Sequence, residues 1–568
     1  MGKDIVLGVK CGGNPNGNGH DCNVAIKGKG IITAIQAERL DRIKKSSGWK
    51  KGTKNYYKKD ITSEDFVGSK LCIEYCMKNI SMKCKDIDLI VVDDLGDRQS
   101  QINEMHKYLK KDIRIVRVSH HLAHAASTFF CSPFEEAAIV VVDGGGGRRK
   151  NKLSGEYEYE RQSFYLGTNN NIELLHTTWS NKKEIWGLGG AYAAHQQILG
   201  LEAGKVMGLA PYGKGELYND FKIFKRLSDI DVLIYDTIIY DDNLENFNIN
   251  KNNNIYNLLR DWDDNPLDQK WADMAYKIQS EIEEEMIYLC NELYRKTSVE
   301  NLCIAGGVGL NSVANKKILD NTPFKNIFIQ PAADDGGIGF GCALYGYHTV
   351  LGHTRDYVMT NAYLGKIYSE DIIINTLNSY KNKIIWTYSN NIISTTAKYI
   401  ADGLIIGWFQ GASEYGPRAL GNRSIICDPR SINLKNKINL KIKGREFWRP
   451  LAPSIMLEYV NDFFDIKEES PFMLLVANAK IDKLDVIPAV IHVDNTARVQ
   501  TINRDQNKVY YDLINEFYKL TGIPLILNTS FNLNNEPIVE TPEDAVDTFI
   551  RAKQMDILVI HNYIITRL

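Results

Sequence analysis

The local pattern that narrows the possible folds furthest is a helix-compatible segment, Ser119–Phe130, followed by an apolar, β-branched run, Ala137–Val142. His120 and His124 stand four residues apart, so on a helix both imidazoles project from one face, one turn apart. The apolar run ends in Asp143 and four glycines, which is typical of a buried strand that delivers a carboxylate into a loop where backbone can approach a phosphate. The pattern predicts that helix and strand bring two imidazoles and a carboxylate to one point.

Two imidazoles at this spacing suit a metal ion, although such pairs also occur on helix surfaces or as hydrogen-bonded core residues. His121 stands where a peptidase of the His-Glu-x-x-His type needs its glutamate base, which argues against that mechanism. Asp335 is our candidate for a third ligand, because it lies in a glycine-rich loop after the predicted strand 327–331. Two histidines and a carboxylate suit iron, zinc or manganese. The alternative for Asp335 is capping of the following helix.

Composition limits the classes of protein that this chain can belong to. With 568 residues the chain is too long for one core, so we expect several domains. A net charge of −2 argues against a nucleic-acid polymer or a membrane surface as the main partner. No run approaches a membrane span and the N-terminus lacks a signal-peptide pattern, so a cytoplasmic protein is expected. The ten cysteines form no C-x-x-C pair, which predicts reduced core thiols.

Strands and helices alternate along the first part of the chain, which predicts an α/β layer architecture. A hairpin with a turn at Lys27–Gly30 places His20 and Asp21 at a loop mouth, where they serve either turn formation or function. The charged segment Glu38–Arg42 is expected to be solvated. Predicted strands are 4–9, 22–27, 31–37, 88–92, 113–118 and 301–305, further β-structure is expected at 148–180, and predicted helices are 62–79 and 271–295.

Two further regions bear on the domain organisation of the chain. Residues 214–268 are rich in asparagine and aspartate and are expected to be a variable insertion, and residues 352–382 are expected to be a linker into a second domain. Basic residues then concentrate after the predicted strand 404–410, a density that suits a small polyanion such as a nucleoside triphosphate, with a solvated basic face as the alternative. These residues are Arg418, Arg423, Arg430, Lys435, Lys437, Lys441, Lys443, Arg445 and Arg449.

Taken together, these segments resemble the bacterial NodU/CmcH-type O-carbamoyltransferases, the family that includes tobramycin carbamoyltransferase. The resemblance covers nearly the whole chain and runs in the same order. It is carried by Gly19–Asp21, His120/His124, Val142–Gly144, Gly204–Tyr212, Gly306–Asn311, Gln330–Ala333, Gly416–Arg423, Trp448–Ser454 and Asn528–Asn532.

The resemblance implies a mixed α/β and α+β fold in two domains. Residues 1–358 would form a Kae1-like domain of the actin/hexokinase type (ASKHA) that transfers the carbamoyl group. Residues 359–568, with the linker, would form a YrdC-like domain that makes carbamoyl adenylate from carbamoyl phosphate and ATP with magnesium. The acceptor would be a hydroxyl of a small molecule: a sugar, a natural product or a modified nucleotide. The resemblance is compatible with a homodimer.

The resemblance also implies roles for individual residues. His120, His124 and Asp335 would hold a metal, usually Fe²⁺, with zinc and manganese as alternatives, and Asp334 remains open as the ligand in place of Asp335. The nucleotide or adenylate would contact Asp143, Gly144, Gly306, Gly307 and Asn311. Carbamoyl phosphate and ATP would be held by Arg418, Lys443, Arg449, Arg498, Asn528 and Ser530. The acceptor would meet His20, Glu202 and Lys205, and the catalytic set would be His20, Asp21, Asp143 and Lys443.

Two other functions are compatible with the same folds. One is a tRNA threonylcarbamoylation enzyme, against which the near-neutral charge argues. The other is a non-catalytic nucleotide-binding protein, against which the completeness of both groups of motifs argues. One departure from the family pattern bears on phosphate binding: a longer run of glycine and arginine, Gly144–Arg149, follows Asp143.

Overall fold

The computed structural model describes residues 4–10, 20–46, 67–95, 105–106, 108–109, 113–180, 187–215, 222–226, 230–234, 238–241, 246–249 and 269–568. These residues form a mixed α/β protein, as the sequence predicts. The chain divides into two compact units: unit 1 comprises Met1–Val92, Gly96–Val116 and Met359–Leu568, and unit 2 comprises Asp93–Leu95 and Arg117–Val358. Among the described residues no helix combines the length and the apolar character that a membrane crossing requires.

The N-terminal sheet is built from strands in the order β3-β2-β1-β4-β5. Its central strand β1 pairs with β2 antiparallel and with β4 parallel, and the predicted turn at Lys27–Gly30 joins β2 to β3. The predicted helix 62–79 is described from Val67 onward, and its expected start at Thr62 lies outside the described residues. The elements are β1 (Val6–Lys10), β2 (Asn23–Gly28), β3 (Ile31–Gln36), α1 (Ala37–Asp41), α2 (Val67–Asn79), β4 (Leu89–Asp93) and β5 (Arg114–Val118).

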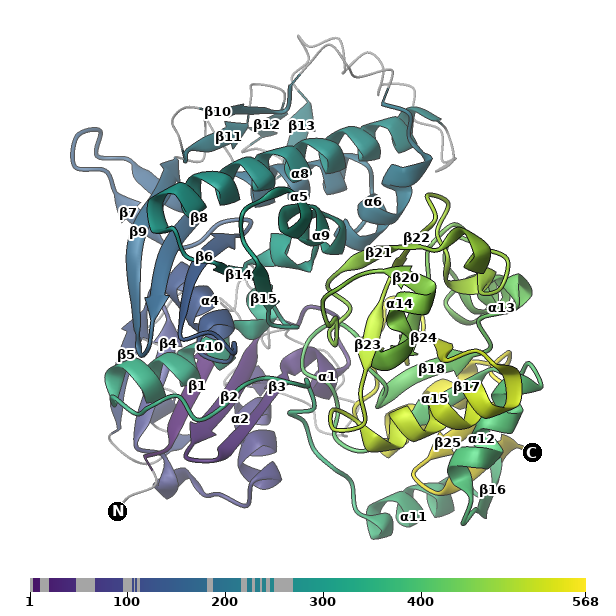
Figure 1. Ribbon diagram of the computed structural model, residues 1–568. Helices are drawn as coiled ribbons and strands as arrows, with labels where there is room; N and C mark the ends of the chain where they lie inside the picture. The colour runs from purple at the N-terminus through teal and green to yellow at the C-terminus, as the bar shows by residue number, and fades with distance from the viewer. Residues whose placement is uncertain are drawn as a thin grey trace. The chain divides into compact units, whose positions relative to one another are not determined.

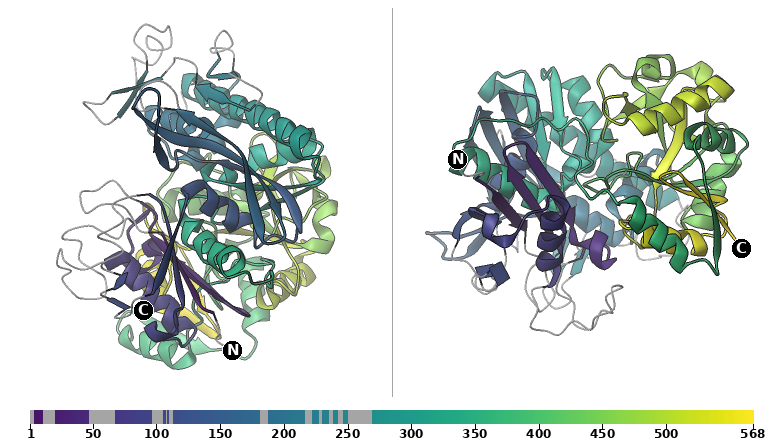
Figure 2. Two further views of the ribbon diagram at one scale, coloured as in Figure 1. Left: turned by 90° about the vertical axis from the view of Figure 1, so that its left-hand side faces the viewer. Right: turned by 90° about the horizontal axis from the view of Figure 1, so that it is seen from below.

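The sheet of unit 2 repeats this pattern along the path β9-β8-β6-β14-β15, with β7 also paired to β8. Its central strand β6 pairs with β8 antiparallel and with β14 parallel. The hairpin of β8 and β9 is long and twisted, and α8 is the long helix of this unit (Figures 1 and 2). The strands are β6 (Glu136–Val142), β7 (Arg148–Lys150), β8 (Tyr157–Thr168), β9 (Asn171–Ser180), β14 (Asn301–Ala305) and β15 (Asn326–Ile329). The helices include α4 (His120–Phe129), α5 (Leu188–Ile198), α6 (Ala203–Leu209), α8 (Gln269–Thr297), α9 (Ser312–Asn321) and α10 (Ile338–Tyr345).

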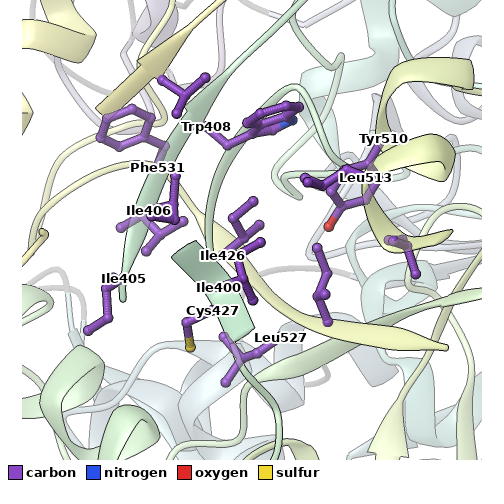
Figure 3. Packing of buried hydrophobic residues seen from close by; sticks show 14 of the residues in the cluster. Ile400, Ile405, Ile406, Trp408, Ile426, Cys427, Tyr510, Leu513, Leu527 and Phe531 are labelled. Carbon is purple, nitrogen blue, oxygen red and sulfur yellow. The ribbon is translucent and has the colours of Figure 1, made fainter. Parts of the chain in front are cut away.

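The C-terminal part of unit 1 is built on a sheet of order β16-β26-β25-β17-β18-β24-β19-β23. Helices α12 and α15 lie side by side against it (Figure 1). Trp408, Ile426, Tyr510 and Leu527 belong to the apolar core of this part (Figure 3). The strands are β16 (Ile384–Tyr388), β17 (Ile406–Phe409), β18 (Arg423–Cys427), β19 (Ala452–Met456), β23 (Gln500–Ile502), β24 (Leu525–Ser530), β25 (Ile557–Ile560) and β26 (Tyr563–Arg567). The helices include α11 (Glu370–Ser379), α12 (Ile392–Ala401), α15 (Lys508–Thr521) and α16 (Pro542–Arg551). A small sheet joins β20 (Phe464–Asp465), β21 (Val476–Ala479) and β22 (Thr496–Arg498).

Two sequence predictions are wrong, and both concern packing. The expected linker 352–382 contains helix α11, whose Ile373 and Leu377 are fully buried in the C-terminal core. The segment Glu38–Arg42 is not simply solvated, because Arg39 is only 1% exposed. In both places one side of a short helix packs against segments that are distant in the sequence.

Two other predictions concern the insertion and the cysteines. Most of the expected insertion 214–268 lies outside the described residues, and the described pieces form two small hairpins. The hairpin strands are β10 (Phe224–Arg226), β11 (Val232–Ile234), β12 (Ile238–Asp241) and β13 (Asn246–Ile249). The described cysteines are unbridged, and all but Cys84 are buried, in agreement with the prediction of reduced core thiols.

Candidate active site

Helix α4 carries both histidines of the predicted metal site. Ser119 caps the helix by accepting the N–H of Leu122 on its Oγ at 3.4 Å. His120 and His124 are both fully buried, with ring centroids 4.8 Å apart. Helix α10 packs closely against α4, because Gly341 has no side chain: a Cβ there would stand 1.9 Å from the carbonyl oxygen of Ala123. A small residue therefore permits the approach that positions the two rings.

Two carboxylates from other elements meet these imidazoles. Asp335 Oδ1 lies 3.2 Å from His120 Nε2 and 3.4 Å from His124 Nε2. Asp143, directly after β6, places its Oδ2 3.7 Å from His120 Nε2. The neighbouring Asp334 instead uses its side chain locally, accepting the N–H of Gly336 at 3.1 Å. The geometry therefore favours Asp335 over Asp334 as a ligand.

This group can hold a metal ion. One ligand atom from each of His120, His124, Asp143 and Asp335 lies within 4.8 Å of the others. The Nε2 atoms of both histidines are buried and make no hydrogen bond with any residue that the structure describes. Buried imidazole nitrogens gathered with carboxylate oxygens are the donor set that iron, zinc or manganese takes in proteins.

The protonation of the cluster reflects crowding of opposite charges. Burial disfavours a charged imidazole, but the carboxylates of Asp335 and Asp143 outweigh it and raise the pKa of His120 well above its usual value. Burial and the charge of Asp335 would raise the pKa of Asp143, yet His120 and His124 prevail and lower it. Protons and a metal cation would therefore compete for the same electron pairs.

Glycines surround Asp143, which was predicted to contact the nucleotide. Gly307 donates its N–H to Asp143 Oδ1 at 2.9 Å, and Gly306 has a φ of +87° and no room for a side chain beside the carbonyl of Val142. A Cβ at Gly144 would meet nothing within 4 Å, so this backbone is open to a ligand. Asn311, which was also predicted to contact the nucleotide, uses its side-chain amide within the protein. Its Oδ1 accepts the N–H of Ala314 and so caps α9, and its Nδ2 donates to Gln279 Oε1.

Several carboxylates in this region escaped the sequence analysis. Asp93 Oδ2 lies 3.2 Å from His120 Nδ1, and Asp94 accepts the main-chain N–H of His120 at 3.1 Å. Glu160 accepts the N–H of Gly147 at 2.7 Å and so holds the glycine run. Asp93 and Asp94 could have been found from the sequence, because they form an Asp-Asp pair at the end of an apolar strand. The same pattern identified Asp143.

A second cluster, in unit 1, consists of cations that are buried, as Lys443 is, or half-buried, as Arg445 and Arg498 are. Burial, and then the charges of Arg418 and Arg445, lower the pKa of Arg498 well below its usual value. Burial, and then Arg445, do the same to Lys443. Burial lowers the pKa of Arg445 itself to about 10. Cations that depress one another's pKa are poised to accept an anion. Arg445 was noticed in the sequence only as part of a basic run.

The other residues predicted to bind carbamoyl phosphate and ATP differ in their roles. Lys443 Nζ donates to Ser530 Oγ at 3.2 Å and to the carbonyl of Asn532 at 2.9 Å. Asn528 is 1% exposed, and its amide donates to Ala419 O, Ser454 Oγ and Gln500 Oε1. Arg449 pairs with Glu446 at 2.8 Å. Asn528 thus supports the loop that carries Arg418.

The residues predicted to meet the acceptor fall into two groups. In unit 2, Glu202 and Lys205 line a cavity of about 480 Å³. Gln196 and Gln197, near the C-terminal end of α5, line the same cavity. His20 belongs to unit 1, and its exposed ring places Nδ1 2.8 Å from Asp21 Oδ2.

Comparisons with known proteins cover most of the chain. The carbamoyltransferase N-terminus family matches residues 100–344, and the carbamoyltransferase C-terminus family matches residues 397–567. Nodulation protein NolNO of Sinorhizobium fredii is 32% identical over 97% of this chain and 80% of its own length. Nodulation protein NolO of Bradyrhizobium diazoefficiens is 34% identical over 79% of each chain. The uncharacterized protein sll1178 of Synechocystis is 37% identical over 79% of this chain and 75% of its own length.

Relatives named nodulation protein U match a shorter stretch, at 35% identity over 41% of this chain for the protein of Sinorhizobium fredii. The resemblance seen in the sequence is therefore confirmed by matches to both halves of the chain. The protein belongs to the carbamoyltransferase family, with relatives among the NodU-type nodulation proteins, and is a carbamoyltransferase enzyme.

Proposed function

We propose that this enzyme is an ATP-dependent O-carbamoyltransferase that works through carbamoyl adenylate. The observation that carries the proposal is the cationic cluster of Lys443, which is buried, with Arg445 and Arg498, which are half-buried; withdrawal from water lowers the pKa of each. Such a cluster is stabilised by a polyanionic ligand, and both carbamoyl phosphate and ATP are polyanions. Arg418, Arg449 and Ser530 complete the proposed binding set, with Asn528 supporting it.

The proposed first half-reaction activates the carbamoyl group. Water releases carbamate and inorganic phosphate from carbamoyl phosphate. A carbamate oxygen then attacks the α-phosphorus of ATP, and pyrophosphate leaves with the electrons of the broken bond. The positive charges of Lys443, Arg445 and Arg498 would offset the charge that develops on the transferring phosphates.

The proposed second half-reaction consumes the adenylate. The acceptor hydroxyl oxygen attacks the carbamoyl carbon, AMP leaves, and the hydroxyl proton passes to a base. His20 is our candidate base, because its pairing with Asp21 through Nδ1 orients Nε2 to take a proton. A divalent metal held by His120, His124, Asp143 and Asp335 would offset negative charge on the departing phosphate. Gly144, Gly306 and Gly307 would let that phosphate approach the backbone.

Residues Glu202 and Lys205 are proposed to bind the acceptor. The cavity that they line with Gln196 and Gln197 offers both donors and acceptors of hydrogen bonds. Amide, carboxylate and ammonium groups together suit a small molecule with several hydroxyls, and a cavity of about 480 Å³ has the size of a small-molecule site.

We further propose a Kae1-like domain over 1–358 and a YrdC-like domain over 359–568. The repeated strand order of the first two sheets supports the first assignment. The second would take in residues 397–567, which the carbamoyltransferase C-terminus family matches as a stretch of its own.

The deciding experiment measures phosphate and pyrophosphate released from purified protein given carbamoyl phosphate, ATP and magnesium, without acceptor and with a panel of hydroxyl compounds. Release in the parent that is lost in Arg418→Ala supports adenylate formation. Absence of both products under every condition contradicts the proposal.

A further inference from the structure

Arg39 is a buried arginine to which the proposed reaction assigns no role. It is 1% exposed, although it lies on the short helix α1 within a highly charged segment. Burial is the main cause that lowers its pKa from the usual arginine value. A guanidinium withdrawn from water needs compensating acceptors, and the positions of those acceptors indicate what it holds in place.

The acceptors of Arg39 belong to the loop that carries Arg418. Nη2 of Arg39 donates to the carbonyl of Gly416 at 2.8 Å and to the carbonyl of Glu414 at 3.3 Å. Its Nε and Nη1 make no hydrogen bond within the described part of the chain. The stronger bond therefore ends two residues before Arg418.

The other end of this loop is closed by Glu414. Its Oε1 accepts the main-chain N–H groups of Leu420, Asn422 and Arg423 at 2.8, 2.8 and 3.1 Å. These bonds fix the backbone after Arg418, whereas Arg39 fixes the backbone before it. Gly416 has a φ of +108°, and glycine at such a position leaves the chain free to turn unless a partner holds it.

We propose that Arg39 is a positioning residue for Arg418. Its guanidinium holds the Gly416 carbonyl and thereby fixes the backbone from which the Arg418 side chain reaches the phosphate of carbamoyl phosphate. The inference rests on the proposed function, because it takes phosphate binding by Arg418 as given.

Arg42 offers a matched control on the same charged segment. It also donates to two main-chain carbonyls, from Nη1 to Ile538 at 2.6 Å and from Nη2 to Pro537 at 2.9 Å, but neither acceptor belongs to the Arg418 loop. Arg42 also pairs with Asp544 at 3.6 Å, so Arg42→Met removes at least as many polar contacts as Arg39→Met, but none of them belongs to the Arg418 loop.

The experiment titrates full-length parent, Arg39→Met, Arg39→Lys and Arg42→Met with carbamoyl phosphate in a calorimeter, in the presence of a non-hydrolysable ATP analogue. Thermal unfolding of the same samples records stability. We expect Arg39→Met to weaken affinity about tenfold or more and Arg42→Met to stay within about twofold of the parent. Arg39→Lys is expected to recover part of the loss, because an ammonium can still donate to one carbonyl.

Parent-like affinity in Arg39→Met overturns the inference, and so does an equal loss in both methionine variants, since general loosening would then explain it. If Arg39→Met does not fold, Arg39→Lys decides: binding about threefold weaker than the parent supports the inference, and parent-like binding overturns it. A parent that does not bind carbamoyl phosphate overturns the proposed function, and this inference with it. Failure of the proposed function is thus distinguished from failure of the inference about Arg39: the first is seen in the parent protein, and the second only in the variants of a parent that binds.

Discussion

The two ring nitrogens of His120 have different surroundings, and this difference determines what each can bind. Nδ1 faces the buried carboxylate of Asp93 at 3.2 Å, whereas Nε2 faces Asp143 and Asp335. A carboxylate on one nitrogen fixes the orientation and tautomer of a histidine that binds a metal through the other. Asp93 is therefore expected to present Nε2 to the metal.

Replacing Asp93 by Asn should weaken metal binding without removing a ligand. We expect the affinity for Fe²⁺ or Zn²⁺ to fall about 10–100-fold, as is usual when such a supporting carboxylate is lost. Asp94→Asn is the control, because Asp94 bonds to the main chain of His120 rather than to its ring. Calorimetric metal titration provides the measurement, and equal affinities in parent and Asp93→Asn would show that the ring needs no such support.

Lys443 should make ligand binding dependent on pH. Burial, and then Arg445, lower its pKa, so its ammonium is present below that pKa and is lost as the pH rises through it. Affinity for carbamoyl phosphate should therefore fall with rising pH in a range below the normal titration of lysine. Lys443→Arg should move this fall in affinity to higher pH, because a guanidinium has a higher intrinsic pKa than an ammonium in the same surroundings. Titrations across pH check the prediction, and identical profiles for parent and variant would contradict it.

At the level of elements, the contact of α4 with α10 sets the geometry of the metal site. Gly341 of α10 faces the carbonyl of Ala123, one residue before His124. A backbone oxygen cannot move aside as a flexible side chain can, so any added atom must separate the helices.

Gly341→Ala tests this contact. The added methyl group would force the helices apart, and overpacking of this kind costs about 1–3 kcal/mol of unfolding free energy. Metal affinity should fall as well, because His120 and His124 move with α4. Gly204→Ala on α6 is the control, since a Cβ there meets nothing within 4 Å. Denaturant unfolding and metal titration give the two readouts; a variant that loses neither stability nor affinity would rule out a tight contact.

For the whole molecule, the proposed chemistry assigns one half-reaction to each cluster. The cationic cluster lies in unit 1 and the His/His/Asp/Asp cluster in unit 2. The two steps should therefore be separable by substitution, because the described residues that form each cluster come from a single unit.

His124→Ala should stop carbamoyl transfer while leaving activation intact. We expect it to release a single burst of phosphate and pyrophosphate, matched by adenylate that stays bound, and to form little AMP or carbamoylated product when acceptor is present. Arg418→Ala should lose all of these products. Phosphate, pyrophosphate and AMP assays on the same samples provide the test, and loss of pyrophosphate release in His124→Ala would show that the two steps are not independent.

Much of the His/His/Asp/Asp cluster could be predicted from the sequence, because the patterns that identify its residues involve near neighbours in the chain. A helix places residues i and i+4 on one face, so His120 and His124 were paired by spacing alone. A strand that ends in a carboxylate marked Asp143 in the same way. Asp93 carried this signal too and was overlooked, because no histidine or glycine run stood beside it in the sequence.

The sequence by itself determined the α/β class, most strand and helix positions, the pairing of the two histidines and membership of the carbamoyltransferase family. These depend on periodicity and on the order of short motifs, which neighbouring residues carry. Tertiary structure placed Asp335 rather than Asp334 beside the two imidazoles, buried Arg39 against a loop more than 370 residues away, and folded α11 into the core. Those outcomes depend on contacts between distant segments, and local patterns contain no record of which distant atoms will meet.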